Sequence, residues 1–204
     1  MSATRSLPPR SQPVLRTTCG AAVELNVDRW RAEADHIERS LLDTLMDPVM
    51  DVGCGPGRIV AALAEGGRVA LGVDVSHAAV AETRRRGAAA LSRSIFAPLP
   101  GENRWASVVL FDGNIGIGGD PVALLSRVRG LLAPGGMALI EVDPPGVVSE
   151  RLTVRIEHDQ HRGPWFAWAR VSADDIADHL IEARLEPRGV ELCGDRWFAR
   201  ATRP

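Results

Sequence analysis

The sequence predicts an α/β fold, a single domain built on a mostly parallel sheet of seven strands with helices on both faces. Three observations lead to this prediction. Short apolar segments alternate with amphipathic ones between residues 48 and 143, as in sheets assembled from right-handed strand–helix–strand units. A glycine-rich turn at residues 53–57 joins the first apolar segment to the helix that follows it. The length of 204 residues suits one domain rather than two.

Helical spacing and capping residues predict the elements of the first half. Apolar side chains recur at helical spacing after Asp28, which is placed as an N-cap, and Ser76 is placed to cap a later helix. A nearly unbroken apolar run around Asp74 predicts a strand that is covered on both faces. In chain order these patterns give a helix over 28–46, a strand over 48–52, a helix over 58–65 stopped by glycines, a strand over 68–76, a helix over 77–86 and a weaker strand over 88–92.

The second half continues this alternation and then departs from it. Asp120 and Pro121 open a helix of recurring leucines, and the Pro-Gly-Gly turn at 134–136 ends it. After residue 143 the pattern becomes that of antiparallel strands, so an inserted hairpin is predicted near residues 150–170. The predicted elements are a strand over 105–112, a helix from 121, a strand over 137–143, hairpin strands over 151–159 and 163–171 about a turn at 160–162, a helix over 174–185 begun by a capping box of Ser172 and Asp175, and two last strands divided near Gly194 and Asp195.

Composition limits the class of protein. Hydrophobic residues make up 45% of the chain and charged residues 25%, with a net charge of −2, so no overall field draws the chain to nucleic acid or to an anionic membrane. The sequence contains no lysine, which excludes a pyridoxal phosphate Schiff base and a P-loop lysine. Cys19, Cys54 and Cys193 are far apart and odd in number, so neither a disulfide framework nor a zinc site is predicted.

A cytoplasmic location and a single domain are predicted. Residues 1–14 are rich in proline, serine and arginine and lack the apolar run of a secretion signal. They are interpreted as a disordered lead-in to a domain over residues 15–204. No stretch approaches the ~20 uninterrupted apolar residues of a membrane span. No sequence feature indicates an oligomeric state.

Three segments of the sequence point to chemistry at one edge of the sheet. The glycines of the turn at 53–57 let the backbone pass close to a ligand beside a helix N-terminus. Asp74 ends the second strand, where a carboxylate can accept both hydroxyls of an adenosine ribose. The run LLAPGG at 131–136 forms a turn before the fifth strand. Asp51 precedes the glycine turn and favours a cofactor with an ammonium group over a pyrophosphate.

In this order, VMDVGCGPG, GVDVS and LLAPGG resemble the class I S-adenosylmethionine-dependent methyltransferases, over residues 28 to 143. The resemblance implies a Rossmann-like fold, the cofactor S-adenosyl-L-methionine and an enzyme that methylates a small molecule. In that family the glycine turn holds the methionine part of the cofactor, the acid after the second strand binds the ribose, and a residue after the third strand binds the adenine. The cofactor-binding residues so implied are Asp51, Gly53, Cys54, Gly55, Gly57, Asp74, Val75, Ser94, Ile95 and Asp112.

Ser94 departs from the family's pattern, which usually has an aspartate where this chain reads RSIF at 93–96. A neutral hydroxyl is a weaker acceptor for an adenine amino group than a carboxylate. Ile95 can sandwich the adenine instead, and its backbone N–H can bond a ring nitrogen. The hypothesis therefore places the adenine against Ser94 and Ile95.

The segment after the fourth strand, FDGNIGIGGD at 111–120, is dense in glycine and permits a tight loop over the cofactor. Asp112 and Asn114 are the candidate catalytic residues that orient the nucleophile, with Asp112 a candidate general base. Methyl transfer from a sulfonium is an in-line displacement, so positioning and water exclusion supply most of the catalysis. A strong base is therefore not required.

The acceptor is expected between the first helix and the hairpin. Trp30 on that helix and three aromatic residues of the hairpin are interpreted as core or lid residues, or as the lining of the acceptor pocket. The hairpin aromatics are Trp165, Phe166 and Trp168. No motif identifies the acceptor or the atom that is methylated.

Two other functions stay open at this stage. A nicotinamide-dependent oxidoreductase uses a similar turn, but Arg58 stands where its third glycine belongs. A non-catalytic module would bind S-adenosylmethionine, or a protein partner, for regulation without turnover. His158, Asp159 and His161 on one hairpin are too few for a ligand set, so no metal site is predicted.

Overall fold

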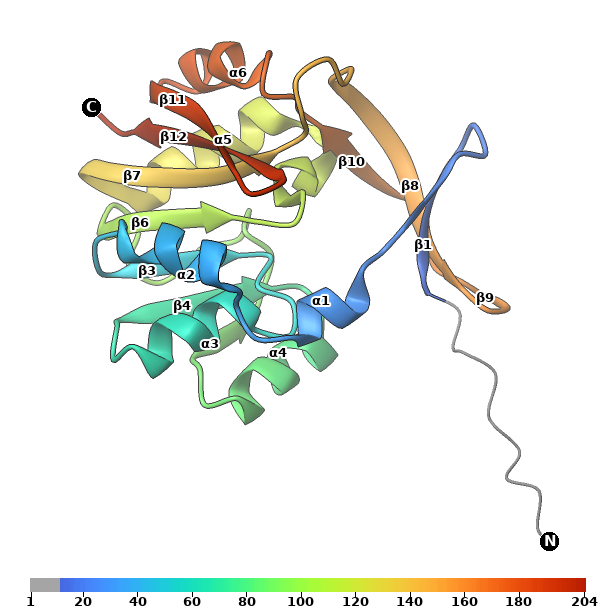
Figure 1. Cartoon of the computed structure of the whole chain (residues 1–204), viewed down its shortest axis with the longest axis horizontal. Coiled ribbons are helices and arrows are strands. Elements are labelled where there is room, and N and C mark those ends of the chain that lie inside the picture. Colours follow the sequence, from blue (N-terminus) through green and yellow to red (C-terminus); the bar gives the residue numbers. More distant parts are fainter. Residues whose placement is uncertain (1–11) are drawn as a thin grey trace, which may run out of the picture.

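The structure, a computed structural model, describes residues 12–204 and is built around one seven-stranded sheet (Figure 1). The strand order is β11-β12-β7-β6-β3-β4-β5, in which the five strands from β7 to β5 are parallel and β12 and β11 are antiparallel. The predicted mostly parallel sheet is confirmed. Its strands are β3 Val49–Val52, β4 Ala70–Asp74, β5 Ala90–Ser92, β6 Trp105–Leu110, β7 Leu132–Val142, β11 Glu186–Cys193 and β12 Arg196–Thr202.

Helices cover both faces of this sheet, as predicted. Alternate residues of a strand point to opposite faces, so Val49 packs with α2 and α3 while Met50 packs with α5 and α6. The side chains of α4 continue the first of these layers over β5. The helices are α2 His36–Asp43, α3 Arg58–Glu65, α4 His77–Arg85, α5 Pro121–Leu131 and α6 Ile176–Glu182.

The prediction of one continuous helix over 28–46 is wrong. Two helices stand there, α1 Val27–Arg31 and α2, and the chain between them is not helical. Asp35 starts α2, because its carboxylate accepts the N–H of Glu38 and the carboxylate of Glu38 accepts the N–H of Asp35. This reciprocal pair is a capping box, which ends one helix and begins another. Asn26, rather than the predicted Asp28, caps α1.

Two predicted helix boundaries also need correction. The LLAPGG run does not end α5, because α5 stops at Leu131 and β7 begins at Leu132, with an irregular register between the partners of Trp105 and Ser107. The predicted capping box of Ser172 and Asp175 is absent from the described α6. The Asp175 carboxylate accepts the hydroxyls of Ser149 and Ser172 and makes no capping bond to the helix.

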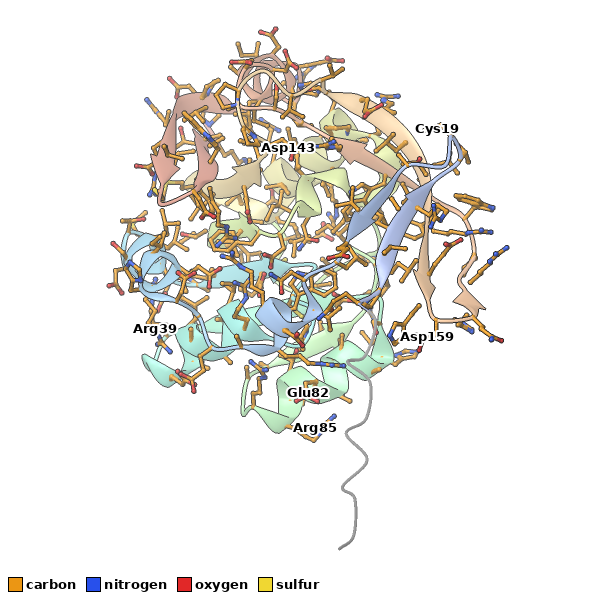
Figure 2. All side chains as sticks on the ribbon, turned by 45° about the vertical axis from the view of Figure 1, so that its right-hand side comes forward. Cys19, Arg39, Glu82, Arg85, Asp143 and Asp159 are labelled. Atoms are coloured by element: carbon orange, nitrogen blue, oxygen red, sulfur yellow. The ribbon has the colours of Figure 1, made fainter. Side chains whose placement is uncertain are left out.

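A second, antiparallel sheet stands beside the first (Figures 1 and 2). The predicted hairpin forms part of it, but the chain reverses at residues 159–160 rather than at 160–162, since His161 already pairs with His158. Two strands near the N-terminus that the sequence did not predict complete this sheet through pairing of β1 with β8. Its strands are β1 Val14–Thr17, β2 Ala22–Glu24, β8 Glu150–His158, β9 His161–Arg162 and β10 Phe166–Arg170.

The second sheet contacts the segment that follows β6. This segment, the 3-10 helix η1 Asn114–Gly119, lies against β10, because a Cβ on Gly116 would lie 2.6 Å from the ring of Trp168. Residues 1–11, most of the predicted lead-in, lie outside the described residues. Among the described helices none is long and apolar enough to span a membrane.

Candidate functional site

The glycine turn after β3 forms a tight elbow that leads into α3. Gly53, Gly55 and Gly57 have φ angles of 73°, 52° and 92°, a region that L-residues with a side chain seldom adopt. The N–H of Gly53 donates to the carbonyl of Val73 over 2.8 Å, which ties the elbow to the neighbouring strand β4. The elbow is therefore fixed against the strand that carries Asp74.

Asp74 and the elbow face each other. The Asp74 Oδ2 atom accepts the N–H of Gly55 over 2.9 Å, and its Oδ1 atom accepts the N–H of Ser76 over 2.8 Å. Each carboxylate oxygen retains a further lone pair for a ligand hydroxyl. The pocket predicted from the sequence requires a carboxylate beside a turn of glycines at the start of a helix, and Asp74 stands in that arrangement.

A cavity opens at this edge of the sheet. Its walls come from the elbow, from the end of β4, from the segment after β6 and from α1. The lining residues are Trp30, Asp51, Gly53, Cys54, Gly55, Pro56, Arg58, Ile59, Asp74, Phe111, Asp112 and Asn114. Most of the sequence-predicted site residues thus share one cavity.

Asp51 lies at the bottom of this cavity with one oxygen unused. Its side chain is only 2% exposed, and its Oδ2 atom has no hydrogen-bond partner among the described residues. Burial, and next the nearby carboxylate of Asp112, raise the pKa of Asp51 to about 7. A buried acceptor without a donor is costly, so this oxygen is suited to a ligand that brings a cation.

Asp112 lies just after β6, where Glu141 and Arg58 are among the residues that hold it. Its φ of 55° is left-handed, its N–H donates to Glu141 Oε2 over 2.5 Å, and its Oδ2 atom pairs with the guanidinium of Arg58. Burial raises the pKa of Asp112, and the charge of Arg58 opposes that rise. These contacts fix the orientation of the carboxylate.

Asn114 holds the elbow from the opposite side. Its Nδ2 donates to the carbonyls of Val52 and Gly53 over 3.0 and 2.9 Å. The approach is so close that a Cβ on Gly53 would lie 2.5 Å from that nitrogen. Because the nitrogen is committed to these two carbonyls, the carboxamide oxygen is the atom left to accept a hydrogen bond from a ligand.

Comparison with known proteins identifies this region. Residues 49–136 match the sequence model of a family described as a methyltransferase domain. This stretch, which contains the elbow and Asp74, is similar to a methyltransferase domain. No curated protein matches the chain by sequence.

Solved structures with the same fold extend the likeness beyond the methyltransferase domain. A methyltransferase from Bacteroides fragilis, in complex with S-adenosyl-L-homocysteine, is 18% identical with a TM-score of 0.77, covering 95% of this chain and 88% of that one. A 1,6-didemethyltoxoflavin-N1-methyltransferase from Burkholderia thailandensis is 19% identical with a TM-score of 0.61, covering 87% and 81%. An amino pentose methyltransferase from Micromonospora echinaspora is 19% identical with a TM-score of 0.60, covering 87% and 95%. The predicted class I methyltransferase fold is confirmed.

Four of the predicted cofactor-binding residues lie outside the cavity lining. Gly57 packs against Thr83, where a Cβ would come within 2.7 Å of that side chain. Val75 is 73% exposed, and the Ser94 hydroxyl accepts the N–H of Phe96 over 3.2 Å. Ile95 is buried and its carbonyl accepts a bond from an arginine of α5.

Sequence analysis missed three residues that shape the site. Arg58 pairs with Asp112 and lines the cavity, and its place directly after the last glycine of the elbow was the available signal. Thr83 donates its hydroxyl to the carbonyl of Gly55 over 2.9 Å and so supports the elbow from α4. Glu38 is fully buried and pairs with Arg58. Trp30, which the sequence placed in the core, a lid or the acceptor pocket, lines the cavity from α1.

The hairpin aromatics divide between two surroundings. Trp165 is 44% exposed and stacks under the guanidinium of Arg155, whose carbon lies 4.5 Å from the ring centre. Phe166 and Trp168 meet edge to face, with ring centres 6.1 Å apart, and Trp168 lies on the η1 segment. None of these three residues belongs to the cavity lining described above.

Proposed function

We propose that this protein binds S-adenosyl-L-methionine in the cavity at the glycine elbow and transfers its methyl group to a small-molecule acceptor. One observation carries the proposal. The elbow, Asp74 and Asp51, whose Oδ2 atom has no hydrogen-bond partner among the described residues, line one cavity at the ends of β3 and β4. This is the edge at which parallel α/β sheets bind their ligands.

The residues present fit the cofactor. The oxygen of Asp51 that has no donor among the described residues matches the ammonium of the methionine part. Asp74 retains acceptor capacity for the ribose hydroxyls beside its bonds to Gly55 and Ser76. Nothing lies within 4 Å of the place where a Cβ on Gly55 would be, so the elbow leaves room for a ligand.

Ser94 and Ile95 are proposed to hold the adenine, on the side of β4 away from β3. Both follow β5, which pairs with β4 at the level of Asp74. The Ser94 hydroxyl already accepts one N–H, from Phe96, and therefore offers its hydrogen as a donor. Val75, which is exposed next to Asp74, is proposed to contact the ribose or the adenine.

The reaction requires orientation more than proton transfer. Bound in the cavity, the cofactor would supply a methyl group already activated by its positive sulfur. We propose that Asn114 accepts a hydrogen bond from the acceptor and that Asp112, fixed by Arg58 and Glu141, orients it. Trp30 and Phe111 would exclude water from the reacting atoms.

The acceptor is proposed to be a small molecule. Two of the similar structures are methyltransferases for 1,6-didemethyltoxoflavin and for an amino pentose. The net charge of −2 supports a small molecule over nucleic acid. A cytoplasmic location, in a single domain over residues 15–204, remains part of this proposal.

Calorimetric titration with S-adenosylhomocysteine tests the binding step. We expect saturable binding to the wild-type protein and an affinity at least about tenfold lower for Asp74→Ala, since the ribose hydroxyls lose a charged acceptor. Asp178→Ala, an exposed carboxylate on α6, is the matched control and should bind as the wild type does.

Other outcomes separate the alternatives. Equal affinity of Asp74→Ala and the wild type would contradict the proposed site, and binding of NADH without binding of S-adenosylhomocysteine would favour an oxidoreductase. A screen of metabolites with methyl-labelled cofactor then tests transfer. Tight binding of the cofactor without turnover of any pool of cellular metabolites would favour a non-catalytic module.

A further inference from the structure

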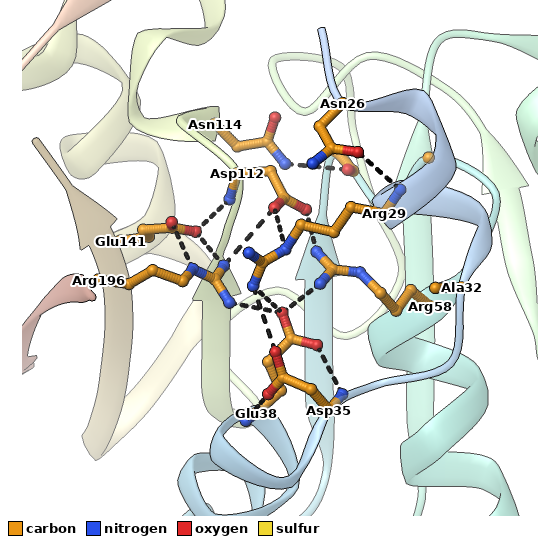
Figure 3. Close-up of polar contacts among 12 residues, drawn as sticks. Asn26, Arg29, Ala32, Asp35, Glu38, Arg58, Asp112, Asn114, Glu141 and Arg196 are labelled. Carbon is orange, nitrogen blue, oxygen red and sulfur yellow. Dashed lines mark hydrogen bonds and ion pairs between the residues drawn. The ribbon is translucent and has the colours of Figure 1, made fainter. Parts of the chain in front are cut away.

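One buried carboxylate on α2 is joined to the cavity by three arginines (Figure 3). Arg58 places one guanidinium nitrogen on Glu38 and another on Asp112. Arg196 does the same, with its Nη1 2.6 Å from Glu38 and its Nη2 3.5 Å from Asp112. Arg29 spans the same two carboxylates, with its Nη2 3.2 Å from Glu38 and its Nε 3.9 Å from Asp112.

The centre of this cluster is buried. The side chain of Glu38 is fully buried, and those of Arg58 and Arg196 are 4% and 8% exposed. Glu141 supplies a third carboxylate, which pairs with Arg196 and also accepts the N–H of Asp112. Asp35 is a fourth carboxylate, which pairs with Arg29, so three guanidinium groups meet four carboxylates. In such a site the loss of one charge is weakly screened by solvent.

Glu38 lies behind the cavity rather than in its lining. Asp112 and Arg58 line the cavity, so the charge of Glu38 acts on a ligand through them. The two oxygens of Glu38 also have separate tasks. Its Oε2 accepts the N–H of Asp35 at the start of α2, whereas its Oε1 accepts all three guanidinium groups.

We propose that Glu38 is a specificity-determining residue, the buried counter-charge that lets a cavity flanked by three arginines favour the cationic sulfonium cofactor over its neutral thioether product. This inference rests on the proposed function. The two ligands share the adenosine and the amino acid part, and they differ by one methyl group and one positive charge. Their affinity ratio therefore reports the electrostatic potential of the cavity.

The sign of the effect follows from the charge count. Removing the charge of Glu38 leaves the three arginines with one negative charge fewer than in the wild type. The extra positive charge weakens binding of the sulfonium and leaves the thioether less affected. Removing an arginine instead shifts the potential the other way. Because Glu38 touches no ligand in this arrangement, a loss of contacts cannot produce these opposite shifts.

The experiment compares two ligands on four proteins. Affinities of S-adenosylmethionine and S-adenosylhomocysteine are measured by calorimetry at pH 8, with no acceptor present, for the wild type, Glu38→Gln, Arg29→Gln and the double variant. We expect Glu38→Gln to shift the affinity ratio about fivefold against the sulfonium, Arg29→Gln to shift it in the opposite direction, and the double variant to restore it. The exposed Glu65, which pairs with Arg39, provides the control Glu65→Gln with an unchanged ratio.

Unchanged ratios in Glu38→Gln and Arg29→Gln, or equal losses for both ligands, would overturn the inference while leaving the proposed function intact. Failure of the wild type to bind either ligand would overturn both. Arg29 is 30% exposed on the short helix α1, so its variant retains the fold and tests the sign by itself if Glu38→Gln unfolds. Thermal unfolding of each variant establishes that the protein measured is folded.

Discussion

Among single residues, Asp51 combines features that the sequence and the structure reveal separately. Its position before the glycine turn is readable from the sequence and suggested an ammonium ligand. Its 2% exposure and the lack of a partner for its Oδ2 atom among residues 12–204 become visible only when α3, β4 and the segment after β6 pack around it. The same holds for Asn114, which the sequence placed at the site. Its bonds to the carbonyls of Val52 and Gly53 depend on contacts between residues more than 60 positions apart.

The raised pKa of Asp51 leads to a pH dependence of cofactor binding. An ammonium group binds the ionised carboxylate, and with a pKa of about 7 that form falls from about nine-tenths at pH 8 to about one-tenth at pH 6. We expect the affinity for S-adenosylhomocysteine to fall about tenfold over this interval, as protons compete for the site. Calorimetry in matched buffers measures the change.

Asp51→Asn is the control for this dependence. The amide cannot ionise, so its affinity should be lower than that of the wild type at pH 8 and nearly independent of pH between 6 and 8. A wild-type affinity that does not change with pH would show that Asp51 is not the ammonium ligand.

At the scale of elements, local signals predicted the strands and helices that alternate along the chain. The strands of the parallel sheet are nearly continuous apolar runs, and capping residues such as Ser76 and Asp120 mark their helices. The break between α1 and α2 was missed because apolar spacing continues across it, although Asp35 and Glu38 stand at capping-box spacing. The spacing of leucines thus outweighed a signal that was present in the sequence.

The separation of α1 from α2 has a functional consequence. None of the five described residues of α1 is buried, yet Trp30 lines the cavity. We expect Trp30→Ala to fold normally and to bind S-adenosylhomocysteine roughly tenfold more weakly, because the ligand loses an aromatic wall. Calorimetry gives the affinity, and thermal unfolding shows whether stability is kept.

Trp165→Ala is the matched control for this helix. That side chain stacks on Arg155 in the second sheet and does not line the cavity, so its removal should leave the affinity unchanged. Equal affinities of the Trp30 variant and the wild type would mean that α1 does not close over the cofactor.

At the scale of the whole molecule, sequence analysis missed the strands of the second sheet that pair with distant segments of the chain. β1 pairs with β8, so that Arg16 meets Glu157 across 141 positions of the chain. Short segments such as VLRT and AVE contain too few apolar residues to predict a strand. Nothing in the adjacent sequence indicates which strand they pair with. The parallel sheet was predictable because each of its βαβ units is contiguous in sequence.

This difference in assembly implies a difference in local stability. The strands β3 and β6 hold side chains with no exposed surface, such as Met50, Val108 and Leu110, whereas no residue of the described β1 and β2 is buried. Segments with few buried apolar contacts open most easily. In hydrogen–deuterium exchange followed by mass spectrometry, peptides from residues 14–24 should therefore exchange well before those from 49–52 and 105–110.

Added S-adenosylhomocysteine should then change this pattern selectively. We expect slower exchange in the elbow at 53–57 and in α1, which enclose the cavity, and little change in β1 and β2, which do not line it. The response of α1 distinguishes a helix that closes on the cofactor from one that merely connects the two sheets. Protection spread evenly over both sheets would contradict this, because it would mean that the ligand stabilises the molecule as one cooperative unit rather than through the walls of its own cavity.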